Sequence, residues 1–218
     1  GLFDLGSLST ACSREALMQI GLWSSLISQR GAKPILVACD HTASLTAVMG
    51  VTDGLEERPT YVYLDAHLDL GRVCHADDLL HNGGFVACLL REGAVAEAVN
   101  IGGRSLMSRH LYDPVPGFGI LPVMPDDWES ALASLRGKAV YVSIDADVLD
   151  PAILSQVPCP EPQGLTGEGL LACCRWLAAN CRVLGADLSE LMPTPQVDEV
   201  PRLLVDCLLA LTAPDGSS

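Results

Sequence analysis

Basic residues are scarce in this sequence: 13 Lys and Arg stand against 27 Asp and Glu, giving a net charge of −14. A chain this acidic repels phosphate backbones, which argues against a nucleic-acid partner. It attracts cations instead, either metal ions or amine and guanidinium groups. No apolar run approaches the ~18 residues of a membrane span, so we expect no membrane partner.

Cysteine patterns typical of a structural framework are also absent. The nine cysteines are odd in number and include no zinc-type Cys-x-x-Cys pair. Cys39, Cys88, Cys173 and Cys207 lie in apolar runs, which predicts buried, reduced thiols. The first residues show no basic and apolar leader, so we expect a cytoplasmic protein.

Charged residues amount to only 18% of the chain, whereas 49% are hydrophobic. This excludes a disordered chain and indicates a large core or a surface covered by a partner, as in a homo-oligomer. A length of 218 residues suits one domain over 1–218.

Apolar, β-branched runs alternate with helical periodicity along the chain. Strands are expected at 34–39, 61–64 and 139–144, with weaker candidates at 99–102, 120–123 and 183–187. Helices are expected at 11–29, 42–49, 79–92, 127–136, 167–180 and 198–212. Continuous apolar strands are buried on both faces, which predicts a three-layer α/β/α fold with a mostly parallel sheet.

Metal-ligand side chains follow three of these strands. They are His41, Asp65, His67, Asp69, Asp145 and Asp147. The carboxyl ends of parallel strands line one crevice, so the three clusters should meet there. Taken one at a time, the same residues could be helix caps and surface acids.

Four aspartates in one small space repel each other, and two divalent cations would compensate their charge. The set is rich in oxygen, contains imidazole and lacks thiolate, which favours manganese. The sequence therefore predicts two Mn²⁺ ions in this crevice.

Five stretches together resemble the ureohydrolases, the family of arginase and agmatinase. They are Ala38-Cys-Asp-His-Thr-Ala-Ser44, Asp65-Ala-His-Leu-Asp69, Ser143-Ile-Asp-Ala-Asp-Val-Leu-Asp-Pro151, Pro160-Glu-Pro-Gln-Gly-Leu-Thr166 and Asp187-Leu-Ser-Glu-Leu191. The resemblance implies the arginase-like α/β/α fold, here shortened at the N-terminus.

The resemblance also implies residue roles. One manganese would bind His41, Asp65, Asp69 and Asp145; the other would bind His67 and Asp147 and share Asp65 and Asp145. Asp150 precedes a proline and is expected to tie its loop rather than bind metal.

Two further residues take roles from the resemblance. Glu190 would hold the substrate guanidinium, and His81 would shuttle protons or contact substrate. Without the resemblance, Glu190 would be an acid at a helix entry and His81 a loop residue.

Gly102-Gly103-Arg104 is too short for a phosphate loop and is interpreted as a strand-end turn.

In this family, the enzymes that act on free arginine bind its α-amino and α-carboxylate groups through particular side chains. The resemblance places Gly71, Asp77 and Ser105 at the corresponding positions of this sequence, so the side chains that bind those groups are missing here. We therefore predict a dimanganese ureohydrolase that converts peptide-bound arginine to ornithine, with agmatine or guanidinobutyrate as the alternative substrate. A non-catalytic binding protein and a metal-dependent deacetylase are the remaining interpretations; the deacetylase is disfavoured because no His-His pair occurs.

Overall fold

Six parallel strands form one sheet in the order β1-β6-β5-β2-β3-β4. The computed structural model describes residues 2–8, 13–71, 82–105, 118–121, 130, 132–192 and 199–212. The strands are β1 (Ile35–Val37), β2 (Thr60–Leu64), β3 (Glu97–Ile101), β4 (Phe118–Leu121), β5 (Ala139–Asp145) and β6 (Arg182–Ser189). Each expected strand is therefore present.

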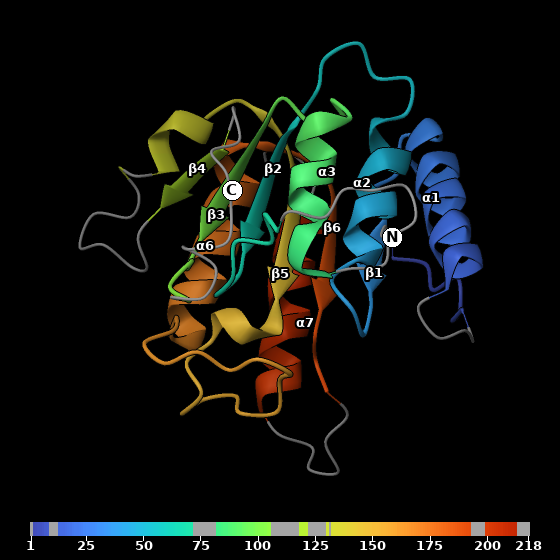
Figure 1. Ribbon diagram of the computed structural model, residues 1–218. Helices are drawn as coiled ribbons and strands as arrows, with labels where there is room; N and C mark the ends of the chain where they lie inside the picture. Colours follow the sequence, from blue (N-terminus) through green and yellow to red (C-terminus); the bar gives the residue numbers. More distant parts are fainter. Residues whose placement is uncertain are drawn as a thin grey trace.

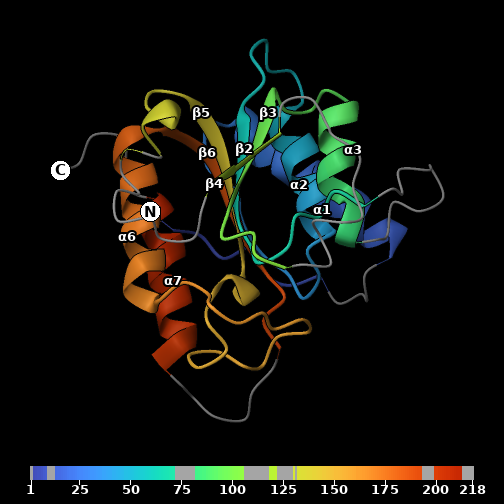
Figure 2. The same ribbon diagram turned by 60° about the vertical axis from the view of Figure 1, so that its left-hand side comes forward.

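Helices cover both faces of this sheet, as Figures 1 and 2 show. One face carries α1 (Arg14–Gln29), α2 (Ala43–Thr52) and α3 (Phe85–Arg91). The other face carries α6 (Gly167–Asn180) and α7 (Glu199–Thr212). The predicted three-layer α/β/α fold with a parallel sheet is confirmed.

The central strands bury side chains toward both helical layers. Tyr61, Tyr63 and Tyr141 lie in the cluster beneath α2 and α3, while Val62 and Ile144 pack with α6 and α7. Alternate residues of a strand point to opposite faces, so a strand between two helical layers is mostly apolar on both faces. This explains why the sequence shows runs rather than alternation.

Local signals fix where the helices begin. The Ser13 hydroxyl accepts a hydrogen bond from Ala16 N, which starts α1 at Arg14. The Thr166 hydroxyl accepts from Gly169 N at the start of α6 in the same way.

Of the helix expected at 127–136, the described part contains the short 3₁₀ turn η2 (Ala133–Leu135). None of the helices described combines the length and apolar character needed to cross a bilayer.

The cysteine predictions are only partly correct. Cys173 and Cys207 are free and buried, as predicted. Cys39 is free but exposed, because it follows β1, a three-residue strand at the edge of the sheet. Cys88 is buried but disulfide-bonded, so the prediction of a reduced thiol is wrong there.

Candidate metal centre

The candidate site lies at the carboxyl ends of four neighbouring parallel strands. His41 follows β1, Glu190 follows β6, Asp145 ends β5 and Asp65 follows β2. Because β6 and β5 lie between β1 and β2, residues far apart in sequence meet. The His41 backbone N–H, for example, donates to Glu190 Oε1 at 2.9 Å.

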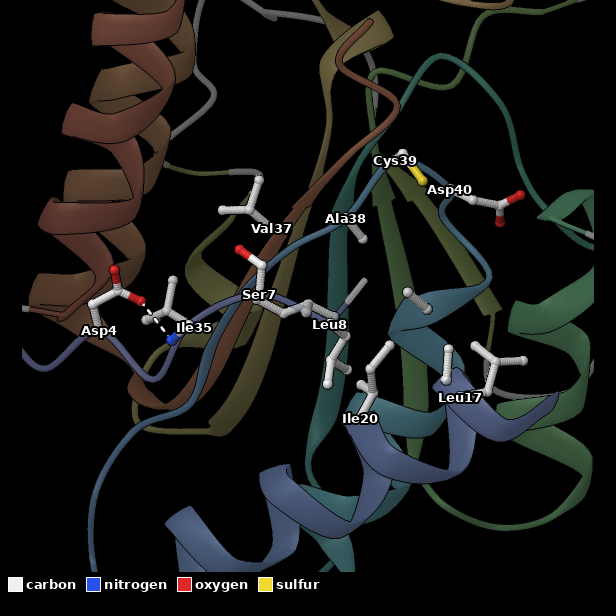
Figure 3. A pocket seen from close by; sticks show the side chains of 14 residues that line it. Asp4, Ser7, Leu8, Leu17, Ile20, Ile35, Val37, Ala38, Cys39 and Asp40 are labelled. Atoms are coloured by element: carbon white, nitrogen blue, oxygen red, sulfur yellow. Dashed lines mark hydrogen bonds between the residues drawn. The ribbon is translucent and has the colours of Figure 1, made fainter. Parts of the chain in front are cut away.

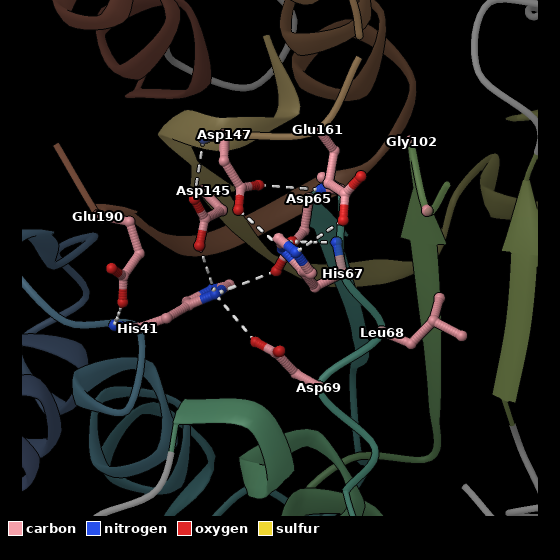
Figure 4. A network of polar contacts seen from close by, with 12 residues as sticks. His41, Asp65, His67, Leu68, Asp69, Gly102, Asp145, Asp147, Glu161 and Glu190 are labelled. Carbon is pink, nitrogen blue, oxygen red and sulfur yellow. Dashed lines mark hydrogen bonds and ion pairs between the residues drawn. The ribbon is translucent and has the colours of Figure 1, made fainter. Parts of the chain in front are cut away.

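The first half of the centre is built around the imidazole of His41. Its Nδ1 lies 3.1 Å from Asp65 Oδ2, 3.1 Å from Asp145 Oδ2 and 3.2 Å from Asp69 Oδ2 (Figure 4). The His41 side chain is 1% exposed. Three carboxylates from two strand ends thus surround one buried ring nitrogen.

The second half of the centre is built around His67. Its Nδ1 lies 2.8 Å from Asp147 Oδ2 and 3.6 Å from Asp65 Oδ1. The two oxygens of Asp65 therefore face different imidazoles, although Oδ1 also accepts the backbone N–H of His67 at 2.6 Å. Asp145 Oδ1 likewise accepts the backbone N–H of Asp147 at 2.9 Å. The sharing of Asp65 and Asp145 between two ions stays a prediction.

Two side chains of the site stand on left-handed backbone. Asp69 has φ of 49° and Glu190 has φ of 61°. Non-glycine residues rarely adopt this conformation, which costs of order 1–3 kcal/mol and clusters at functional sites. Glu190 directly follows β6, and Asp69 lies in the segment after β2. The Glu190 carboxylate accepts the backbone N–H of His41, and the Asp69 carboxylate faces His41 Nδ1.

The centre carries too much negative charge for its burial. Burial, and then the Asp65 charge, raise the pKa of Asp69 to about 7. Burial and the neighbouring carboxylates also raise the pKa values of Asp145 and Asp147. The pKa of Asp65 is lowered, because the two imidazoles outweigh the effect of its burial. Bound cations would relieve this repulsion.

Buried atoms without partners test whether a metal fits. Among the described residues, His41 Nδ1 and Asp65 Oδ2 make no hydrogen bond, although they lie 3.1 Å apart. Both atoms are buried, carry lone pairs and lie close together. A divalent cation bound by such atoms would satisfy them. The groups His41, Asp65, Asp145 and Asp65, His67, Asp147 each bring one ligand atom per residue within 4.8 Å of the others.

Positioning residues that carried no predicted role surround this centre. Ser143 Oγ lies 2.8 Å from His41 Nε2 and donates to Asp187. Tyr63 donates to Leu68 O at 2.6 Å, and the Asn100 amide donates to His67 O at 2.8 Å. The available sequence signal was a polar residue inside an apolar strand, as Ser143 and Asp187 are.

Other predicted positions have different outcomes. Asp150 accepts the backbone N–H groups of Ala152 and Gly164, so its role in tying the loop is confirmed. Ser105 is buried at 1% exposure. At Gly71, an added Cβ would lie 2.5 Å from the carbonyl oxygen of Gly83. The residues outside the described part include His81, the predicted proton shuttle, and Asp77.

A separate pocket of about 430 Å³ lies beside the edge strand (Figure 3). Its lining includes Asp4, Leu8, Leu17, Ile35 and Asp40. None of the six predicted metal ligands lines it. The pocket is therefore distinct from the candidate centre, although Asp40 directly precedes His41.

The sequence of this chain is similar to those of known proteins. The profile of the arginase family matches residues 1–211. The guanidino acid hydrolase, mitochondrial, of Homo sapiens is 28% identical over 193 residues, which are 82% of this chain and 53% of that protein. The agmatinase, mitochondrial, of Gallus gallus is 28% identical over 80% of this chain and 54% of its own length. The chain thus spans about half the length of these curated relatives.

Solved structures show the same fold at lower identity. The agmatine ureohydrolase of Thermoplasma volcanium superposes with a TM-score of 0.80 at 22% identity, covering 97% of this chain and 72% of that one. The arginase of Bacillus subtilis superposes with a TM-score of 0.77 at 18% identity, covering 98% and 84%. These likenesses concern the fold.

Proposed function

The chain belongs to the arginase family, and we propose that it is a metal-dependent hydrolase that cleaves a guanidino group and releases urea. The observation that carries this proposal is the convergence of two imidazoles and four carboxylates at one sheet edge, with Asp65 facing both imidazoles. The relatives named above act, by their names, on guanidino acids and agmatine.

Two manganese ions are the proposed cofactor. His41, Asp65, Asp69 and Asp145 would hold one ion, and His67 and Asp147 the other, with Asp65 and Asp145 shared. The donor set is oxygen-rich and lacks thiolate, which suits Mn²⁺ better than Zn²⁺. When bound, the two ions would supply the positive charge and Lewis acidity that make water nucleophilic at neutral pH.

Glu190 would bind the guanidinium of the substrate. Glu190 is only 7% exposed, and its carboxylate accepts a hydrogen bond from the backbone N–H of His41. A planar guanidinium pairs its N–H groups with the two oxygens of a carboxylate, and the low local dielectric strengthens this pair. This contact would place the guanidino carbon beside the predicted ligands.

Proton transfer would involve Asp69 and His81. The reaction adds water to the guanidino carbon and breaks its bond to the alkyl nitrogen, giving urea and a primary amine. Asp69, turned inward on its left-handed backbone, would accept the proton of the attacking water. His81 would protonate the departing amine, a role that rests on the sequence resemblance.

The proposed substrate is a peptide-bound arginine. Gly71 offers no side chain, and the close approach of Gly83 leaves no room for one. Ser105 offers a neutral hydroxyl rather than a carboxylate that would pair with an α-amino group. Both features support a site that does not read free α-amino and α-carboxylate groups. The acidic chain would also attract a basic peptide.

A urea-release panel tests the reaction and the substrate together. It compares free arginine, agmatine, guanidinobutyrate and a peptide with an internal arginine, with mass spectrometry for the loss of CN₂H₂ from the peptide. The highest kcat/KM is expected for the peptide. A preference for agmatine or guanidinobutyrate would favour the small-guanidine alternative, and a preference for free arginine would contradict the interpretation of Gly71 and Ser105.

We also propose that the chain forms homo-oligomers. Large apolar side chains of α1 are exposed, among them Met18 at 68%, Leu22 at 59% and Trp23 at 50%. Exposed apolar surface of this kind is typical of contact sites. Light scattering coupled to size exclusion gives the mass in solution, and a monomer mass of 23.0 kDa would contradict the proposal.

A further inference from the structure

Arg104, which follows β3, spans three segments around the His67 half of the centre. Its guanidinium reaches the turn after β3, the 3₁₀ turn η3 (Ala146–Val148) with the residue after it, and the loop before α6. The acceptors are the carbonyl oxygens of Gly102, Asp147, Leu149, Glu161 and Pro162, at 2.8 to 3.3 Å.

Two of these contacts act on residues that face His67. Arg104 Nη2 donates at 2.8 Å to the carbonyl of Asp147, whose carboxylate lies 2.8 Å from His67 Nδ1. The same nitrogen donates at 2.8 Å to the carbonyl of Glu161, whose Oε1 lies 3.7 Å from His67 Nε2. The Arg104 guanidinium thus holds the backbone of the residues on both sides of the His67 imidazole. Figure 4 shows the side chains of His67, Asp147 and Glu161.

The main chain of Arg104 strengthens the same connection. Its N–H donates to Ala66 O at 2.9 Å, and Ala66 N–H donates to Asp147 Oδ1 at 3.0 Å. The loop that carries His67 and the turn that carries Asp147 are therefore fixed to one residue. A guanidinium presents several donors in a rigid plane, whereas a lysine ammonium is a single point that cannot reach three segments at once.

Glu161 adds an electrostatic constraint on the ring. A neutral imidazole can direct the lone pair of Nδ1 toward Asp65 and Asp147 only when Nε2 carries the proton. A carboxylate beside Nε2 favours this tautomer, and carboxylates commonly support metal-ligating histidines in this way. At 3.7 Å the contact is an ion-pair distance rather than a direct hydrogen bond.

The two histidines therefore have separate supports. His41 Nε2 faces Ser143, which donates to Asp187, and Arg104 makes no described contact with either residue of that pair. We infer that Arg104 is a positioning residue for the His67 half alone, acting through Asp147 and Glu161. The inference rests on the proposed dimetal function but concerns residues outside the predicted ligand set.

The test measures metal binding without any guanidino substrate. The full chain is stripped with chelator and titrated with MnCl₂ by calorimetry, and bound manganese is counted after dialysis. Arg104→Met keeps the apolar stem and removes the donors. It is expected to weaken one of the two ions by about 10- to 100-fold and to leave the other within about threefold. Arg104→Lys should recover only part of this loss.

Two further variants keep the test decisive. Glu161→Gln retains size but not charge, and it should weaken the same ion by a smaller factor even if Arg104→Met fails to fold. Ser143→Ala should weaken the other ion, so the double variant with Arg104→Met should show both losses, each close to its single-variant value.

The outcomes separate the inference from the function beneath it. If wild-type chain binds two ions and the Arg104 and Glu161 variants bind both as tightly, the inference is overturned and the proposed function stands. Equal weakening of both ions by Arg104→Met also overturns it, because that pattern indicates a general loss of structure. If wild-type chain binds fewer than two Mn²⁺ ions, the dimetal function itself is overturned, and the inference with it.

Discussion

Ser143 and His41 meet at 2.8 Å between Oγ and Nε2, in a contact that joins β5 to the segment after β1. Ser143 has one hydroxyl proton and donates it to Asp187, its register partner on β6. Ser143 must therefore accept the Nε2 proton of His41, which leaves the Nδ1 lone pair directed at the three carboxylates. The strand pairing thus selects the tautomer that a metal ligand needs.

Removing this hydroxyl should impair one half of the centre. Ser143→Ala is expected to lower the affinity of the His41 ion about 10-fold, because the ring loses the acceptor that fixes its tautomer. Ser189→Ala is the matched control, since Ser189 Oγ is also buried but has no hydrogen-bond partner among the described residues. Manganese titration checks both. Equal affinities in the two variants would contradict the role of Ser143.

Asp65 should be required for both ions. Its Oδ2 faces His41 and its Oδ1 faces His67, so Asp65→Asn is expected to lose both ions and to lower kcat/KM more than about 100-fold. Asp206→Asn, an exposed change on α7, is the control for the loss of one acidic group. Metal counting after dialysis and urea release check the result. Two retained ions in Asp65→Asn would exclude it as the shared ligand.

Glu190→Gln should separate substrate binding from metal binding. The amide keeps an oxygen that can accept the His41 N–H but loses the charge that pairs with guanidinium. We expect kcat/KM to fall at least about 30-fold, the cost of removing one partner of a buried charged pair. Manganese content should not change. Wild-type kinetics in this variant would place Glu190 outside the substrate site.

The chelated protein should lose stability as the pH rises from 5 to 9. The pKa of Asp69 is raised from 3.8 to about 7 and that of His67 from 6.5 to about 11. Burial and Asp65 act on Asp69; for His67, Asp147 and Asp65 outweigh burial. The folded chain therefore holds more protons than the unfolded chain, and unfolding becomes easier as these protons are lost.

The manganese-loaded protein should behave in the opposite way, because metal competes with protons for the same ligands. Its Tm is expected to hold or rise over the same pH range. Melting curves at several pH values, with chelator and with MnCl₂, check the divergence. A Tm of the chelated protein that rises with pH would contradict the assigned shifts.

The strand ends of the site could be predicted from sequence. Asp65, His67 and Asp145 directly follow or end apolar runs, and the carboxyl ends of parallel strands share one edge. The strand order could not be predicted, because apolar runs buried on both faces look alike. The convergence of Glu190 with His41 depends on that order.

The outer contacts were beyond the sequence for a different reason. The meeting of Ser143 with Asp187 depends on a register that shifts between Val140 and Tyr141. Arg104 was interpreted only as part of a strand-end turn, yet its acceptors include carbonyls 43 to 58 residues away. Neither the spacing of the residues nor the composition predicts contacts between residues so far apart in the sequence.

The single-domain organisation and the residue roles stay predictions.

The sheet order also governs when the centre can form during synthesis. Of the strands in the described residues, β5 and β6 are synthesised after the other four, yet they lie in the sheet between β1 and β2. A nascent chain that ends at Arg136 contains His41 and Asp65 but has no strand to hold β1 beside β2. The His67 half needs only β2 and β5, which pair directly, whereas the His41 half must wait until β6 has emerged and inserted beside β1. Until then a partly made chain exposes apolar strand edges that invite misassembly.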